Sequence, residues 1–117
     1  MTANKRLVES YFSSTGTEYA RLLSDDVELI EWAPGVPSGG ARTLGKEAYV
    51  KNRGARGYET HLSRLTEEGD VVVAEGTARG AKPGGGYWRV QFCDVFEIRE
   101  GKVKRISTYG TDVQDAP

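Results

Sequence analysis

The sequence predicts an α+β fold in which helices come first and an antiparallel sheet follows. In the first third of the chain, apolar residues recur at the one, three and four spacing of an amphipathic helix. From Tyr58 onward they alternate with a period of two, which is typical of strands. Turn signals separate these later runs at hairpin loop lengths. Helices and strands segregated along the chain in this way indicate an α+β domain.

Length and composition are those of one small globular domain. The chain has 117 residues, of which 38% are hydrophobic and 28% charged. We expect a single domain over residues 1–117 that buries about two-thirds of the surface of the extended chain. A core of that size is large enough to wall a small cavity.

Charge and cysteine content exclude several classes of function. The 16 basic and 17 acidic residues are scattered and give a net charge of −1, so no surface for nucleic acid or an anionic membrane is expected. One cysteine, Cys93, and one histidine, His61, allow neither an internal disulfide nor a His/Cys metal cluster. No apolar run reaches 18 residues, and no apolar segment follows the basic pair Lys5-Arg6. A cytoplasmic location is therefore expected.

Three helices are predicted at the start of the chain. The first carries the apolar stripe of Leu7, Val8, Tyr11 and Phe12. After a break at Gly16, the stripe of Tyr19, Leu22 and Leu23 predicts a second helix with Thr17 as its cap. Residues 45–52 are compatible with a short third helix.

Five strands are predicted from the alternating segments. Residues 27–33 form the first, which a turn at 34–37 ends, and the glycine-rich segments 35–45 and 84–86 are expected to be loops. The other four cover residues 58–66, 71–80, 87–99 and 102–112, and together predict an antiparallel meander.

The strand over residues 87–99 carries the most informative side chain. One of its faces is apolar except for Asp94 at the middle. Because burying an ionised carboxyl costs several kcal/mol, Asp94 must be paired, hydrogen-bonded or protonated with a raised pKa. A protonated acid can donate a hydrogen bond to a developing oxyanion. The alternatives are an ion pair with Arg79 or Arg105, or an exposed position at a strand bend.

Two further residues are candidates for acid–base chemistry. Glu31 shares a strand face with Val27 and Leu29, and two carboxylates in unlike surroundings can divide acid and base roles. The alternative for Glu31 is a strand-end residue in water. Tyr11 lies in the apolar stripe of the first helix, where most tyrosines are core residues whose hydroxyl finds a convenient partner.

Several segments resemble the nuclear transport factor two-like superfamily, and within it the branch of ketosteroid isomerases and SnoaL-like polyketide cyclases. The resemblance rests on Tyr11 and on segments 22–28, 45–48 and 92–103, of which the last is the most specific. It implies a cone-like, curved, mixed but mainly antiparallel sheet packed against three N-terminal helices. It also implies a homodimer.

The resemblance assigns roles to individual residues. Asp94 falls on the aspartic acid that donates a hydrogen bond to the substrate oxygen, Glu31 on the general base, and Tyr11 on the tyrosine of the oxyanion hole. Some dehydratases of the superfamily use a pocket histidine, and His61 is the residue available for that part beside Asp94. The alternative is that His61 has its hydrogen bonds satisfied within the protein or faces solvent.

We therefore expect a cofactor-free acid–base enzyme, with no metal, that moves protons next to the carbonyl of a small apolar, steroid- or polyketide-like compound. The expected pocket walls are Trp32, Trp88, Phe92, Phe96 and Tyr109. Cys93 faces away from Asp94, so a nucleophilic role is not expected. The alternatives are a non-catalytic module for small-molecule binding or dimerisation, and a dehydratase or epoxide-opening cyclase that uses Asp94 with His61 or Glu31.

Overall fold

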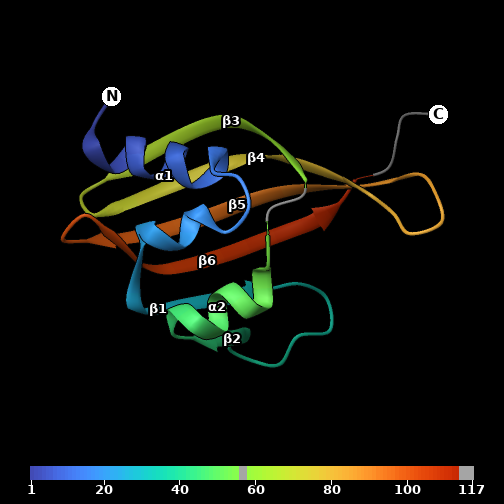
Figure 1. The fold of residues 1–117 in the computed structure, drawn as a ribbon, viewed down its shortest axis with the longest axis horizontal. Coiled ribbons are helices and arrows are strands. Elements are labelled where there is room, and N and C mark those ends of the chain that lie inside the picture. The colour runs from blue at the N-terminus through green and yellow to red at the C-terminus, as the bar shows by residue number, and fades with distance from the viewer. Residues whose placement is uncertain (56–57, 114–117) are drawn as a thin grey trace.

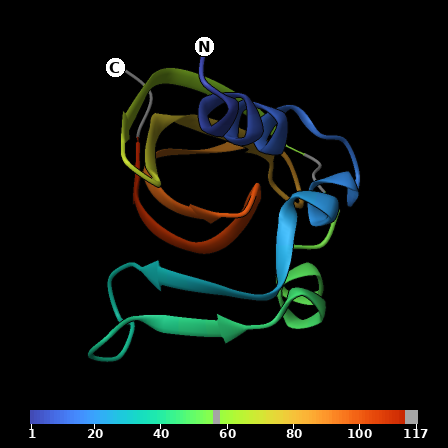
Figure 2. The same cartoon turned by 90° about the vertical axis from the view of Figure 1, so that its left-hand side faces the viewer.

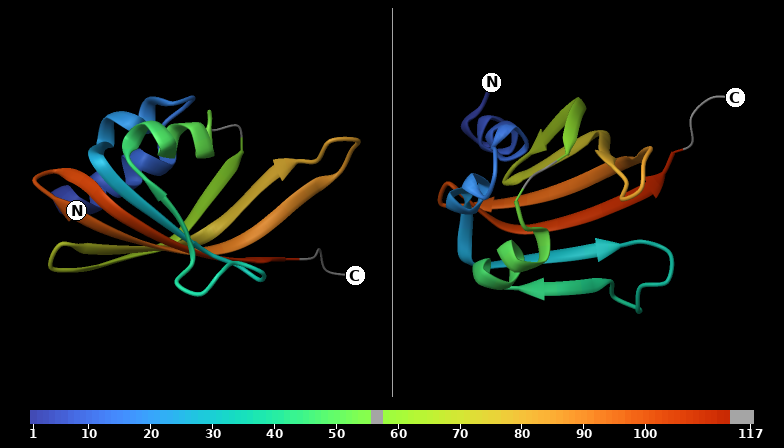
Figure 3. Two further views of the ribbon diagram at one scale, coloured as in Figure 1. Left: turned by 90° about the horizontal axis from the view of Figure 1, so that it is seen from below. Right: turned by 45° about the vertical axis from the view of Figure 1, so that its right-hand side comes forward.

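Six strands of the computed structural model, which describes residues 1–55 and 58–113, form one sheet in the order β2-β1-β6-β5-β4-β3 (Figure 1). The strands are β1 Leu23–Trp32, β2 Ala41–Leu44, β3 Glu59–Glu68, β4 Val71–Ala81, β5 Tyr87–Arg99 and β6 Lys102–Asp112. Strands β1 and β6 run parallel, and every other neighbouring pair is antiparallel. The sheet is strongly curved and does not close (Figure 3), so the predicted α+β fold with a curved, mainly antiparallel sheet is confirmed.

Two α-helices and a short 3₁₀ helix cover this sheet. Helix α1, Ala3–Ser13, begins at Thr2, whose hydroxyl accepts a hydrogen bond from the backbone amide of Lys5. Figure 2 shows the meander curving around α1. Helix α2, Lys46–Arg53, lies where residues 45–52 were expected to be helical, and it packs against β1 and β2. The third helical segment is the 3₁₀ helix η1, Glu18–Leu22.

The predicted second helix is shorter than expected, and β1 begins earlier. Leu23 starts β1 and pairs with Val103 of β6, so the segment expected to close a helix extends along the sheet instead. Thr17 makes no side-chain capping hydrogen bond. Burial of Leu23 and Val27 in the core holds this segment as a strand, which outweighs its helical spacing.

Strand β2 was expected to be part of a loop. Its four residues pair antiparallel with residues 28–31 of β1. Gly40, just before it, adopts a left-handed backbone with φ of 84°, and a Cβ there would meet the side chain of Ile30 at 2.7 Å. A glycine is therefore needed where this loop closes over β1.

The two faces of β5 differ as the sequence predicted. We call the face that carries Asp94 the inner face, and the face that carries Cys93 the outer face. Phe92, Asp94, Phe96 and Ile98 alternate along β5 and are all buried. The helix α1 packs on this side, where Phe12 stacks on Phe92 with ring centroids 5.4 Å apart. Helix α1 therefore covers the inner face of the curved sheet.

Small residues on β4 make room for the large ones on β5. The inner face of β4 presents Val72, Ala74, Gly76, Ala78 and Gly80. Gly80 lies opposite Trp88, whose ring a Cβ would meet at 2.4 Å. The aromatic side chains of β5 can therefore lie over β4, because β4 offers them little side-chain volume.

Gly76 gives a test of this packing. A Cβ at Gly76 would lie 2.2 Å from the carbonyl oxygen of His61 on β3, so β3 and β4 would have to separate. We expect Gly76→Ala to lower the free energy of unfolding by about 1–3 kcal/mol, measured by urea denaturation. Gly110→Ala is the matched control, because its Cβ would meet its nearest neighbour at 3.8 Å. Equal stability of the two variants would contradict this account.

Candidate functional site

A cavity of about 320 Å³, which we call the inner cavity, opens between the inner face of the sheet and α1. Its lining combines aromatic rings with a few polar groups. The lining residues are Tyr11, Phe12, Arg53, Tyr58, Thr60, Ala78, Trp88, Val90, Phe92, Asp94, Thr108 and Gly110. The inner cavity therefore brings together two of the predicted site residues, Asp94 and Tyr11, which lie 83 positions apart in the sequence.

Asp94 is buried, with 8% of its surface exposed. Strand β6 places Thr108 opposite it, and the Thr108 hydroxyl donates a hydrogen bond to Oδ1 of Asp94. The ion pairs considered for Asp94 are made elsewhere, since Arg79 pairs with Glu59 and Arg105 with Glu28 and Glu97. Asp94 is thus held by the sheet and faces an aromatic cavity.

The hydroxyl of Tyr11 is hydrogen-bonded to the hydroxyl of Tyr49 from α2. Tyr49 is fully buried. Burial raises the pKa of Tyr49 well above its ordinary value, and the neighbouring Tyr11 raises it further, while Arg53 acts in the opposite direction. The Tyr49 phenol therefore stays protonated at neutral pH beside the hydroxyl of Tyr11, whose side chain lines the inner cavity.

The raised pKa of Tyr49 predicts a loss of stability at high pH. Below pH of about 10 the Tyr49 phenol is protonated in both folded and unfolded chains. Above it, the unfolded chain releases the proton and the folded chain does not, so the free energy of unfolding falls as pH rises.

Urea melts between pH 8 and 11 measure this effect in the wild type and in Tyr49→Phe. We expect the variant to show a smaller decline in stability above pH 10. Absorbance of phenolate from the folded protein supplies a second measurement, with the urea-unfolded chain as the control. Ionisation of Tyr49 at pH 10 in the folded protein would contradict the prediction.

A second cavity of about 400 Å³, which we call the adjoining cavity, holds Glu31. It shares Arg53, Val90, Thr108 and Gly110 with the inner cavity. As predicted, Glu31 lies on the same face as Leu29, since their partners on β6 are Thr108 and Ile106. Its side chain is about one-third exposed, and Oε1 lies 3.7 Å from Nη2 of Arg53. Glu31 therefore lines a cavity next to the inner one and does not line the inner cavity itself.

Arg53, the last residue of α2, stands between these two cavities. Burial acts to lower the pKa of its guanidinium, but the neighbouring Tyr49, Tyr11 and Glu31 outweigh burial and raise this pKa above its ordinary value. Arg53 thus carries a fixed positive charge at the wall that the two cavities share.

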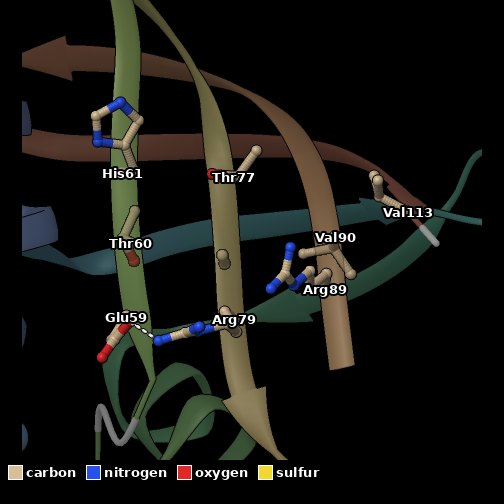
Figure 4. A pocket seen from close by; sticks show the side chains of 9 residues that line it. Glu59, Thr60, His61, Thr77, Arg79, Arg89, Val90 and Val113 are labelled. Carbon is tan, nitrogen blue, oxygen red and sulfur yellow. Dashed lines mark hydrogen bonds and ion pairs between the residues drawn. The ribbon is translucent and has the colours of Figure 1, made fainter. Parts of the chain in front are cut away.

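His61 does not face Asp94. A β-bulge between Leu62 and Arg64 reverses the alternation along β3, so Leu62 and Leu65 both pack against the core. His61 is exposed on the outer face, where it lines a cavity of about 600 Å³ with the ion-paired Glu59 and Arg79 (Figure 4). The expectation that His61 shares the site of Asp94 is therefore wrong.

The predicted pocket walls lie in four different places. Trp88 and Phe92 line the inner cavity, and Trp32 lines the adjoining one. Phe96 is fully buried beneath α1, with its ring against that of Tyr11. Tyr109 pairs with Cys93 on the outer face, where its ring stacks on that of Trp32. Phe96 and Tyr109 thus fall outside the inner cavity.

Cys93 lies on the outer face, as predicted. Burial raises the pKa of its thiol, and the neighbouring Glu75 carboxylate raises it further. The thiol is therefore protonated at neutral pH and remote from the inner cavity.

Sequence reasoning missed Tyr49, Arg53, Tyr58 and Thr108 as lining or supporting residues. The first two come from α2, whose eight residues carry only one fully buried side chain. Thr108 could have been found from the pairing of β5 with β6, because the hairpin at Glu100-Gly101 sets its register opposite Asp94.

Neither a membrane-spanning helix nor a cluster of metal ligands is found among the described residues. Within residues 1–55 and 58–113, no helix has the length and apolar character needed to cross a membrane. In the same part of the chain, no three His, Cys, Asp or Glu side chains are grouped so that they could hold a metal ion.

Comparisons with known proteins agree with the fold. The profile of the SnoaL-like domain family matches residues 5–106. An NTF2-like protein of unknown function from Cytophaga hutchinsonii ATCC 33406 is 14% identical, with a TM-score of 0.71 over 93% of this chain and 96% of that chain. Comparison with curated protein sequences gave no match.

Two further solved structures carry functional descriptions. A protein described as a SnoaL-like polyketide cyclase, from Jannaschia sp. CCS1, is 17% identical, with a TM-score of 0.77 over 92% of this chain and 85% of that chain. A protein described as a ketosteroid isomerase, from Kribbella flavida DSM 17836, is 21% identical, with a TM-score of 0.73 over 98% and 82%. These neighbours confirm the nuclear transport factor two-like fold that the sequence resemblance implied.

Proposed function

This chain belongs to the SnoaL-like domain family, and from that premise we propose that it is an acid–base enzyme acting on a small apolar carbonyl compound. One observation carries the proposal. A nearly buried carboxyl group, Asp94, lies in a cavity with aromatic walls that Tyr11 also lines. In the proposed reaction Asp94 is a neutral carboxylic acid, which can donate a hydrogen bond.

The proposed reaction is proton transfer next to the carbonyl group. The apolar body of the substrate lies among Phe92, Trp88 and Tyr58, with its carbonyl oxygen toward Asp94 and Tyr11. Glu31 removes a proton from the neighbouring carbon, and the resulting enolate oxygen accepts hydrogen bonds from Asp94 and Tyr11. Glu31 then returns the proton to another carbon of the conjugated system, so the substrate is isomerised with no net change in atoms.

The lining residues that the two cavities share support this division of roles between Glu31 and Asp94. The adjoining cavity of Glu31 and the inner cavity of Asp94 have Arg53, Val90, Thr108 and Gly110 in common. A ligand that extends across this wall can contact both carboxyl groups. A dehydratase mechanism with His61 is not part of the proposal, because His61 lies on the outer face.

The direct test is a set of unconjugated enones, from small bicyclic β,γ-enones to 5-androstene-3,17-dione, assayed for conjugation by ultraviolet absorbance. Binding of the same compounds is measured at the same concentrations. For at least one compound that binds, we expect the rate of conjugation to exceed the rate in buffer alone. Binding of several enones with no turnover would overturn it and favour the alternative, a non-catalytic small-molecule-binding module.

A further inference from the structure

We infer that Arg53 makes the inner cavity selective for a monoanionic ligand, in which a flat apolar body carries a carboxylate or a comparably delocalised oxyanion. The inference rests on the proposed function, because it names the substrate class of the same site. It goes beyond that function by requiring a negative charge that proton transfer next to a carbonyl does not itself require.

The position of Arg53 is the first argument. The side chain lines both the inner and the adjoining cavities, so a ligand in either one can contact it. Its side chain is 30% exposed, so water competes only in part for the guanidinium. Charge interactions at such a site are stronger than on an open surface.

Unused hydrogen-bonding capacity is the second argument. The Nε atom of Arg53 is buried and has no hydrogen-bond partner among the described residues. The contact of Nη2 with Glu31, at 3.7 Å, is longer than a hydrogen bond. A guanidinium presents its N–H donors as a planar fork that suits a carboxylate, and the Nη donors, which make no hydrogen bond to Glu31 at this distance, can donate to a ligand carboxylate.

The surroundings of Arg53 define the rest of the ligand. Trp88, Phe92, Phe12 and Tyr58 contribute rings to the inner cavity, which favours a flat apolar body. Glu31 lies in the adjoining cavity and would repel a second negative charge there. The structure therefore favours a single charge placed at Arg53.

The test compares 2-naphthoate with 2-acetylnaphthalene, which have the same ring system and differ in carrying a carboxylate or a neutral acetyl group. Affinities are measured by titration calorimetry at fixed low salt. We expect the wild type to bind 2-naphthoate about tenfold more tightly or better. Arg53→Gln should lose that preference while its affinity for 2-acetylnaphthalene stays within about twofold.

Two further variants sharpen the comparison. Glu31→Gln removes the carboxylate that competes for Arg53, so it should bind 2-naphthoate more tightly than the wild type does. Arg42→Gln removes one positive charge from an exposed side chain paired with Glu28, and should leave both affinities unchanged. If Arg53→Gln does not fold, the opposite effects of Glu31→Gln and of added salt on 2-naphthoate binding still test the inference.

The inference is overturned if the wild type binds neither probe, if it binds both equally, or if Arg53→Gln weakens both probes alike. The two sets of measurements distinguish failure of this inference from failure of the proposed function. Enone conjugation with no preference for 2-naphthoate would refute the anion site alone. Preference for 2-naphthoate, abolished in Arg53→Gln, without conjugation of any enone would refute the acid–base reaction alone.

Discussion

Replacing Asp94 with asparagine is expected to lower kcat for enone conjugation by about 10²-fold or more. Asparagine keeps the shape of the side chain, and its carbonyl oxygen can accept the hydrogen bond from Thr108 that Asp94 Oδ1 accepts. The amide can still donate to a carbonyl oxygen, but it donates more weakly than a carboxylic acid. The loss should therefore appear in kcat, with a free energy of unfolding close to that of the wild type.

Asp70→Asn is the matched control for this variant. Asp70 is exposed at the turn between β3 and β4, so the substitution makes the same chemical change far from the inner cavity. It should leave kcat and stability unchanged. If Asp94→Asn retained full activity, Asp94 would not be the group that stabilises the enolate.

Glu31→Gln is expected to lower kcat by roughly 10²–10⁴-fold, because glutamine cannot accept the proton that a general base removes. The amide is nearly the same size as the carboxyl group, and Glu31 lines the adjoining cavity and not the inner one. Affinity for a neutral enone should therefore change by less than about threefold. Steady-state kinetics and a separate binding titration measure the two quantities.

The control for this variant lies on the same strand. Glu28 is on the outer face of β1, where it pairs with Arg42 and Arg105. Glu28→Gln should retain full activity, with only a small loss of stability from weakened surface ion pairs. Turnover by Glu31→Gln equal to that of the wild type would remove Glu31 from the mechanism.

The long strands were predictable because their apolar and polar residues alternate in step with buried and exposed side chains. In β5, alternation alone placed Phe92, Asp94 and Phe96 on one buried face and Cys93 on the other. The same pattern singled out Asp94 before any contact was known, since a carboxyl group in a row of apolar side chains needs a physical explanation.

Other parts of the site depend on local features that periodicity does not record. One bulge in β3 moved His61 to the outer face, because a single extra residue exchanges the faces of a strand. The four residues of β2 are too few to give a pattern. Tertiary packing of Leu23 on the core decided that β1 begins there.

Arg53 was not predicted for a related reason. Its importance comes from where α2 ends relative to β1, β6 and α1, and not from the neighbours of Arg53 in the sequence. A lone arginine at the end of a short helix is most often a surface residue. Only the packing of α2 against β1 reveals that it stands between two cavities.

The proposed reaction depends on Asp94 being a proton-bearing acid in the inner cavity. A carboxyl carbon NMR titration of the free protein, assigned with Asp94→Asn, tests it most directly. We expect the Asp94 signal to keep the chemical shift of a protonated carboxyl group well above pH 4, whereas an ordinary aspartate ionises at about 3.9. If the Asp94 signal titrated near that ordinary value, Asp94 would be ionised at neutral pH and could not be the acid of the proposed reaction.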